Sequence, residues 1–282
     1  MPLATPINAD LHCHSSFSDG VLSPAELALR AHRQGVQLWS LTDHDELAGL
    51  TQAARAAAEL DLQFVPGVEI SVSFARKTVH IVGLNIDPTH VVLVEALDQL
   101  RGWRETRAQE MGQRLAGLGF EGCYEGALRY ADNPNLLSRT HFARFMVDQG
   151  WFGSMQDVFD RYLGDGKPGN VPGKWATLED SVRWIRAAGG TAVIAHPGRY
   201  KFTEQQFDAL YSTFRDLGGT AIEVITGSHR PDQYAEYAGI ARYYGFQASR
   251  GSDFHSPDES DIDLGALPGL PAGLTPVWAN WV

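Results

Sequence analysis

The sequence is poor in cysteine and in long apolar runs. Its 282 residues include two cysteines, Cys13 and Cys123, which cannot build a disulfide framework and suit a reducing compartment such as the cytoplasm. No apolar run approaches the roughly 18 residues that a membrane-spanning helix needs, so we expect no transmembrane segment. The first six residues contain neither a basic region nor an apolar stretch, and we therefore expect no secretory signal.

Positive charge is also scarce. The chain has 23 Lys and Arg against 34 Asp and Glu, a formal net charge of −11. This balance argues against a broad electrostatic surface for nucleic acid or anionic lipid. We therefore expect no membrane partner and no stable nucleic-acid partner, although an anionic small molecule held at one local site is compatible with the charge.

Short apolar runs alternate with helical patterns along most of the chain. For example, Ser23, Pro24 and Glu26 form the start of a capped helix that Gly35 is placed to end. Seven buried strands, mostly separated by helices, predict a parallel α/β arrangement and a barrel. The expected strands are residues 8–12, 36–42, 62–70, 78–84, 191–195, 221–225 and 246–249.

One internal stretch breaks this rhythm. Residues 87–174 are mostly helical, and the stretch has edges rich in glycine and proline, such as residues 164–173. We interpret it as a helical insertion that caps the barrel, and residues 1–86 and 175–282 as the barrel itself.

Histidines and carboxylates stand at the ends of the expected strands, where folds of this kind place their chemistry. His12 and His14 are two apart in an extended segment and therefore point the same way. A single histidine of this kind is usually structural, but nine such residues exceed the needs of one ion and favour a multinuclear centre in which Glu69 bridges two ions. Histidine with carboxylate and without cysteine favours Mn, Fe or Zn over Mg or Ca. The nine are His12, His14, Asp19, His44, Glu69, His80, His196, Asp253 and His255.

The motifs DLHCHS, TDHD, PGVE, AHP and GSDFH, together with the strand that holds His80, occur in this order along nearly the whole chain. In this respect the sequence resembles the PHP (polymerase and histidinol phosphatase) family of metal-dependent phosphoesterases. The resemblance implies a distorted (β/α)7 TIM-like barrel and two or three ions, typically Mn²⁺. It assigns His12, His14, Glu69 and Asp253 to the first ion, Glu69, His80 and His196 to the second, and Asp19, His44 and His255 to the third. Many relatives have histidine where Asp19 stands.

Within the family, Ser138-Arg139-Thr140-His141 and the helical insertion resemble the subgroup that acts on nucleotides. This implies removal of the 3′-phosphate from nucleoside 3′,5′-bisphosphates, such as adenosine 3′,5′-bisphosphate, and in related members trimming of short RNA from its 5′ end. Another phosphomonoesterase, such as a histidinol phosphate phosphatase, and a non-catalytic PHP module are the alternatives. We expect direct attack of activated water on phosphorus, with Glu69, Asp19, His44, Asp43 and Arg139 as the catalytic set.

Several residues are candidates for substrate contacts, each with a plainer alternative. Asp43 either orients the neighbouring ligand or transfers a proton, or it caps a loop. Arg139 and His141 either grip a phosphate or begin a solvated helix. Arginines at helical spacing are often a solvated face. The full set of candidates for the phosphates or the sugar is Arg104, Arg107, Asn135, Arg139, His141, Arg199 and His229.

Overall fold

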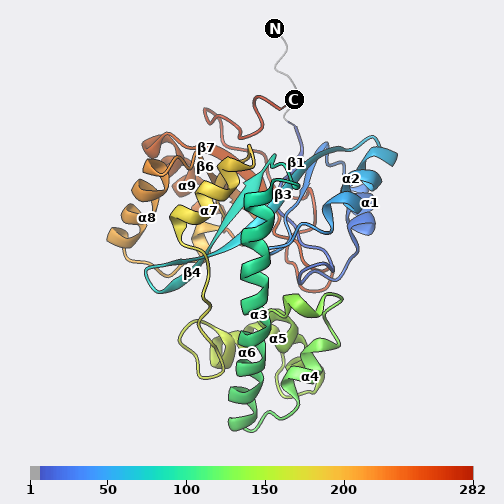
Figure 1. Cartoon of the computed structure of the whole chain (residues 1–282). Coiled ribbons are helices and arrows are strands. Elements are labelled where there is room, and N and C mark those ends of the chain that lie inside the picture. The colour runs from blue at the N-terminus through green and yellow to red at the C-terminus, as the bar shows by residue number, and fades with distance from the viewer. Residues whose placement is uncertain (1–6, 282) are drawn as a thin grey trace.

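A computed structural model describes residues 7–281 (Figure 1). Residues 1–6, on which the expectation of no signal sequence rests, lie outside this range. One seven-stranded sheet follows the order of the chain. The segments of its first and last strands lie side by side, because Leu11 N donates to Arg250 O (3.0 Å) and Asp253 N donates to His12 O (2.8 Å). The sheet thus curls into a nearly closed barrel, as predicted. The strands are β1 (Ala9–Asp10), β2 (Leu38–Leu41), β3 (Gln63–Phe74), β4 (Lys77–Leu84), β5 (Thr191–Ile194), β6 (Ala221–Thr226) and β7 (Gln247–Gly251).

Strand β4 departs from the expected parallel arrangement, since it is antiparallel to both β3 and β5. A two-residue turn, Ala75 and Arg76, joins it to β3, and both residues have positive φ (47° and 63°). Such turns usually carry glycine or asparagine, so no residue pattern here indicated the hairpin. The reversal has a consequence for the site: His80 lies near the start of β4, paired with Ser71, and so reaches the same end of the barrel as the carboxyl ends of the parallel strands.

Within residues 7–281, five helices surround the barrel, and the three that begin at Pro24, Leu178 and Glu204 are capped by the serine or threonine that precedes them. At α1, Ser23 Oγ accepts from the backbone N–H of Glu26, whose carboxylate accepts from Ser23 N, as predicted. The main apolar core lies between these helices and the strands, and includes Trp39, Ile81 and Phe214. The helices are α1 (Pro24–Arg33), α2 (Leu50–Glu59), α7 (Leu178–Ala187), α8 (Glu204–Asp216) and α9 (Pro231–Tyr244), with a short 3₁₀ turn η3 (Pro197–Arg199).

A second group of helices, which we call the cap, projects from the barrel (Figure 1). Its long helix α3 (Val91–Gly117) buries Leu93 and Leu97 in the barrel core, whereas Met111 and Leu115, further along the helix, belong to a separate apolar cluster. We retain residues 87–174 as the proposed extent of the cap. Its other elements are α4 (Cys123–Leu128), η1 (Pro134–Leu136), α5 (Arg139–Asp148), α6 (Met155–Val158) and the π-helical turn η2 (Phe159–Leu163).

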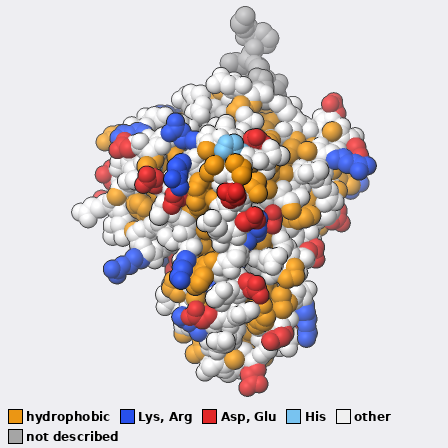
Figure 2. Space-filling view, in the orientation of Figure 1, with side chains coloured by type: hydrophobic (Ala, Val, Ile, Leu, Met, Phe, Trp, Pro, Cys, Tyr) orange, Lys and Arg blue, Asp and Glu red, His pale blue; other side chains and the backbone are white. Residues whose placement is uncertain are grey.

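The surface of this face mixes the two signs of charge. In Figure 2, lysine and arginine side chains lie scattered among acidic ones, without a continuous basic stripe over the coloured residues. Among residues 7–281, no helix combines the length and the apolar character that crossing a membrane requires.

Arg250 holds the closing strand to the C-terminal segment. It is 3% exposed and donates to Asn8 Oδ1 (2.7 Å) and Pro268 O (2.8 Å), and it also contacts the carbonyls of Ala9 and Leu267. We expect Arg250→Met to lower the free energy of unfolding by about 2–4 kcal/mol, because it leaves several buried carbonyls without a donor.

Urea unfolding followed by circular dichroism measures this effect. The matched control is Arg242→Met, because Arg242 makes one exposed hydrogen bond, to Ala272 O (2.9 Å). Equal unfolding midpoints for the two variants would show that Arg250 does not secure the closure.

Candidate metal centre

The nine predicted ligands converge at one end of the barrel. His12 and His14 follow β1, and His44 follows β2, where it forms a bridge with Glu69 of β3. His196 follows β5, and Asp253 and His255 follow β7. Hydrogen bonds between the two closing segments, such as His14 N to Phe254 O (2.9 Å), bring the first and last of these motifs together. The structure therefore unites residues that are up to 243 positions apart.

Glu69 lies at the centre of this cluster and is fully buried. Its Oε1 is 2.9 Å from both His80 Nδ1 and His196 Nε2. Its Oε2 faces a different set of rings, at 2.9 Å from His44 Nδ1, 3.2 Å from His14 Nε2 and 3.3 Å from His12 Nε2. The two oxygens of one carboxylate thus serve two groups of nitrogen donors, which is the arrangement that a bridging ligand needs.

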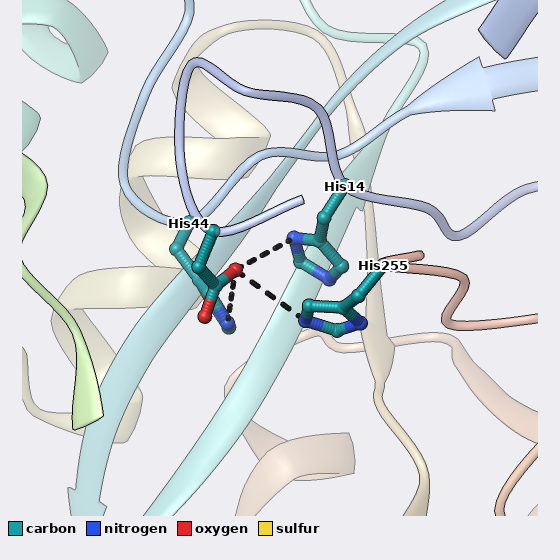
Figure 3. Close-up of side chains that lie close together, drawn as sticks. His14, His44 and His255 are labelled. Atoms are coloured by element: carbon teal, nitrogen blue, oxygen red, sulfur yellow. Dashed lines mark ion pairs between the residues drawn. The ribbon is translucent and has the colours of Figure 1, made fainter. Parts of the chain in front are cut away.

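Two further carboxylates complete the cluster. Asp253 Oδ1 is 3.2 Å from His14 Nε2. Asp19 Oδ1 is 3.4 Å from His255 Nε2, 3.8 Å from His44 Nε2 and 3.9 Å from His14 Nδ1. Figure 3 shows His14, His44 and His255 arranged around this one carboxylate oxygen. Donor atoms within 4.8 Å of one another form four overlapping sets: His14, Asp19, His44 and His255; His12, His14 and Asp253; His12, Glu69 and His196; and His44, Glu69 and His80.

Unpartnered atoms at the cluster fit bound cations. Within residues 7–281, Asp19 Oδ1, Glu69 Oε2 and His44 Nδ1 are buried without a hydrogen-bond partner, as are His14 Nδ1 and His196 Nδ1. Buried polar atoms in proteins almost always have such a partner, so a group of exceptions at one place needs an explanation. Nitrogen and carboxylate donors at these separations match the chemistry of Mn, Fe or Zn.

The charges of the cluster are those of a cation site. Burial alone would raise the pKa of the Glu69 and Asp19 carboxyls. His80 and His44 outweigh this for Glu69 and hold its pKa well below the usual range. His44 and His255 do the same for the pKa of Asp19. Burial lowers the pKa of His44 to about 4 and, with nearby Arg199, that of His196 to about 3. Ionised carboxylates and neutral imidazoles are the forms that bind metal.

His14 behaves differently from these two rings. Burial lowers its pKa, but the adjacent carboxylates of Asp253 and Glu69 outweigh this effect and raise the pKa to about 10. A cation bound there would therefore displace a proton from His14.

Glu223 of β6 supports the cluster, and our sequence reasoning missed it. Its Oε1 is 2.7 Å from His12 Nδ1, and its Oε2 accepts from His196 N (2.5 Å). A carboxylate on the far nitrogen of a ligating histidine fixes the orientation of the ring and increases its basicity. The sequence does contain a signal for this role, because Glu223 is the only charged residue in the apolar run Ala221–Thr226.

Asp43 forms hydrogen bonds with the loop after β1. Its Oδ1 accepts from Ser15 N (2.7 Å) and Ser18 Oγ (2.6 Å), and its Oδ2 accepts from Ser15 Oγ (2.6 Å). Both oxygens are thus occupied by hydroxyls and a backbone amide. These contacts match the expected loop capping, and a role of Asp43 in the reaction stays a prediction.

A cavity beside the cluster lies between the barrel and the cap, and four arginines line it. Three of them face carboxylates: Arg104 pairs with Asp45, Arg139 Nη1 is 3.0 Å from Asp165 Oδ1, and Arg199 Nη1 is 2.8 Å from Asp253 Oδ2. Arg107 forms no ion pair within the described residues. The aromatic side chains of Phe159 and Trp175 also line the cavity; its lining includes Asp19, His44, Glu69, Ser71, Thr78, His80, Ser138, Thr140, His196, Asp253 and His255.

Arg104 has a structural partner that the sequence did not indicate. It donates Nε to Asp45 Oδ2 (3.0 Å) and Nη2 to Ser71 Oγ (2.9 Å), and Ser71 N donates to Asp45 Oδ1 (2.8 Å). This buried network ties α3 to the loop that carries His44. The charge of Arg104 is therefore already balanced, and anchoring the cap, rather than binding substrate, accounts for its contacts.

Three predicted substrate contacts lie outside the cavity lining. His141 is buried within α5, where Nδ1 accepts from Ser138 N (3.0 Å). Both nitrogens of His229 are used within the fold, since Nε2 accepts from Gly198 N (3.0 Å) and Nδ1 lies 3.2 Å from Val224 O. Asn135 is exposed in the turn η1. Their positions match structural and surface roles.

Comparison with known proteins agrees with this geometry. The sequence model of the PHP domain family matches residues 10–106. A 3′,5′-nucleoside bisphosphate phosphatase of Chromobacterium violaceum is 49% identical, covering 96% of this chain and 95% of its own. A 5′-3′ exoribonuclease of Escherichia coli is 42% identical, covering 96% and 93%.

Solved structures agree as well. An amidohydrolase of Chromobacterium violaceum with bound sulfate superposes with a TM-score of 0.93 at 49% identity, over 96% of this chain and 94% of its own. The chain belongs to the PHP family of metal-dependent phosphoesterases.

Proposed function

We propose that this protein removes the 3′-phosphate from nucleoside 3′,5′-bisphosphates such as adenosine 3′,5′-bisphosphate. The observation that carries the proposal is the position of Arg107, a buried cation without an ion-pair partner in the described chain, in the wall of the cavity that the metal cluster shares. A buried charge is costly unless it is paired. A second phosphate on the substrate supplies that partner while the first phosphate lies at the ions. The relative from Chromobacterium violaceum carries this activity in its name.

The expected ligands divide into three groups, and Glu69 belongs to the first two. His12, His14, Glu69 and Asp253 would hold one ion, and Glu69, His80 and His196 a second. Asp19, His44 and His255 would hold a third. Mn²⁺ suits these donors, and Fe or Zn also fits them. When bound, such ions lower the pKa of water and neutralise charge on phosphoryl oxygens.

The chain's own side chains prepare the site for this chemistry. Glu69 keeps the ligand groups together, and Glu223 orients His12 through a 2.7 Å contact. Arg139, the second candidate for phosphate binding, is anchored by Asp165 and lies over the ring of Phe159, 5.9 Å from its centroid. Phe159 and Trp175 provide apolar walls against which a base can stack. The cavity is thus a local cationic site in a protein of net charge −11.

Trimming of short RNA from the 5′ end is a second candidate activity. It is favoured by the exoribonuclease of Escherichia coli, which matches over 96% of the chain. The same two elements, ions for one phosphodiester and Arg107 for a neighbouring phosphate, suit a 5′-phosphorylated oligonucleotide. Two buried free cysteines fit a cytoplasmic location, where both substrates occur.

Turnover of a panel of phosphorylated compounds with Mn²⁺ tests the proposal. We expect kcat/KM for adenosine 3′,5′-bisphosphate to exceed that for adenosine 3′-monophosphate by about 100-fold, the effect of one buried ion pair of roughly 2.7 kcal/mol. A 5′-phosphorylated tetranucleotide and histidinol phosphate complete the panel.

Faster turnover of histidinol phosphate than of the bisphosphate would refute the nucleotide assignment. Less than one equivalent of metal after incubation with Mn²⁺, with no activity on any compound, would support a non-catalytic module instead.

A further inference from the structure

The two oxygens of Asp19 have different surroundings. Oδ1 faces the rings of the cluster, the nearest being His255 at 3.4 Å. Oδ2 points to the cap, where it accepts hydrogen bonds from Ser138 Oγ and Thr140 Oγ1, both at 3.0 Å. Asp19 comes from the loop between β1 and α1, whereas its two donors stand at the start of α5. One ligand of the barrel is therefore held by the cap.

The hydrogen-bond pattern at the start of α5 fixes the direction of the Ser138 hydroxyl. Ser138 Oγ accepts from Thr140 N (3.1 Å), and Ser138 N donates to His141 Nδ1 (3.0 Å). Since the oxygen of Ser138 is engaged as an acceptor, its proton is free to be donated to Asp19. The contact between Ser138 and Asp19 is shielded from water, because Ser138 is 9% and Asp19 is 2% exposed, whereas Thr140 is half-buried. Hydrogen bonds to an ionised acceptor are about twice as strong as neutral ones.

We propose that Ser138 and Thr140 are positioning residues through which the cap holds Asp19 as a ligand for the third ion. The inference rests on the proposed metal centre and goes beyond it, because it makes the affinity of one ion depend on an element outside the barrel. Without the two hydroxyls, the Asp19 side chain gains rotational freedom, and Oδ1 no longer stays directed at His14, His44 and His255.

Thr140 separates this role from helix capping. Ser138 caps α5, so its loss would weaken the helix as well as the contact with Asp19. Thr140 Oγ1, in contrast, contacts only Asp19 among the hydrogen bonds of the described chain. Thr140→Val therefore removes one hydrogen-bond donor from Asp19 and leaves Ser138 in place at the N-terminus of α5. Thr140→Ser restores the donor. Ser154→Ala is the matched control. Ser154 also lies at the N-terminus of a helix of the cap, where its Oγ accepts from Asp157 N (3.2 Å), but it touches no expected ligand.

The test is a titration of the metal-free protein with Mn²⁺ by calorimetry, with bound metal counted by mass spectrometry. We expect Thr140→Val to bind one ion about 10-fold more weakly, the lower end of the effect of groups that support a ligand, while the affinity for the remaining ions stays at the parent value. Thr140→Ser and Ser154→Ala should match the parent protein.

Parent-like affinity for every ion in Thr140→Val would overturn the inference. So would an equal loss for all ions, or the same loss in Ser154→Ala, because either would show a general effect on the cap. The readout is metal binding, so it stays informative even if the substrate assignment fails in the panel of phosphorylated compounds.

Discussion

Replacement of Glu69 by glutamine is expected to lower kcat for phosphate release by at least about 1000-fold and to reduce the metal content. The substitution keeps the size of the side chain but removes its charge and turns one oxygen into an amide nitrogen, which cannot bind a cation. Because each Glu69 oxygen faces a different group of histidines, at 2.9 Å on either side, losing one oxygen affects two groups. A loss of roughly 4 kcal/mol of transition-state stabilisation corresponds to this factor.

A graded comparison makes this prediction sharper. Glu223 is also a buried carboxylate, but it contacts Nδ1 of His12, the ring nitrogen that points away from Glu69. We expect Glu223→Gln to cost about 10–100-fold in activity or metal affinity, as supporting groups of metal ligands do. Both variants are measured by phosphate release and by bound metal per chain. Near-normal turnover of Glu69→Gln with full metal content would rule out a bridging carboxylate, and equal losses in the two variants would show that charge alone matters.

The convergence of the nine expected ligands could be predicted, because it depends on local patterns. Most of these residues stand within or shortly after a short apolar run, and although one such histidine is usually structural, several of them at the ends of neighbouring strands indicate a shared site. His80 lies at the cluster as expected, although the expected direction of its strand was wrong. It was expected on a parallel strand, but it reaches the site because β4 runs in the opposite direction.

The partners of Arg104 and Glu223 could not be predicted, because no local pattern marks them and only the fold brings them together. Arg104 has the helical spacing of a solvated arginine, and only the fold shows that it meets Asp45, 59 positions earlier. Glu223 and His12 are 211 positions apart. The net charge of the chain also hides the arginine-lined cavity, since charge summed over the sequence says nothing about where opposite signs gather.

Arg107 is the residue from which we expect the most selective effect. It is 4% exposed and donates Nε to Val171 O (2.7 Å) and Nη2 to Asn170 Oδ1 (3.2 Å), both neutral acceptors. Burial, with Arg139 and Arg104 nearby, lowers its pKa to about 9, so the guanidinium stays charged at neutral pH. The centroid of the Trp175 ring lies 5.2 Å from Arg107 Cζ. A cation over an aromatic face is stabilised without being neutralised.

We expect Arg107→Met to lower kcat/KM for adenosine 3′,5′-bisphosphate by about 100-fold and that for adenosine 3′-monophosphate by less than about 3-fold. The first substrate loses a buried ion pair worth roughly 2.7 kcal/mol, whereas the second has no phosphate to pair with Arg107. The ratio of the two values, measured by phosphate release, isolates this interaction from any general damage to the site.

Arg114→Met provides the matched control for this substitution. Arg114 lies on the same helix and braces the same segment, through Nη1 to Asn170 O (2.7 Å), but it is absent from the cavity lining. If the role of Arg107 were to support that segment, both variants would lose activity on both substrates alike. A selective loss confined to Arg107→Met and to the bisphosphate follows only if the guanidinium meets the second phosphate. That outcome would also explain how an acidic protein holds a doubly charged nucleotide, with the ions taking one phosphate and a single unpaired arginine the other.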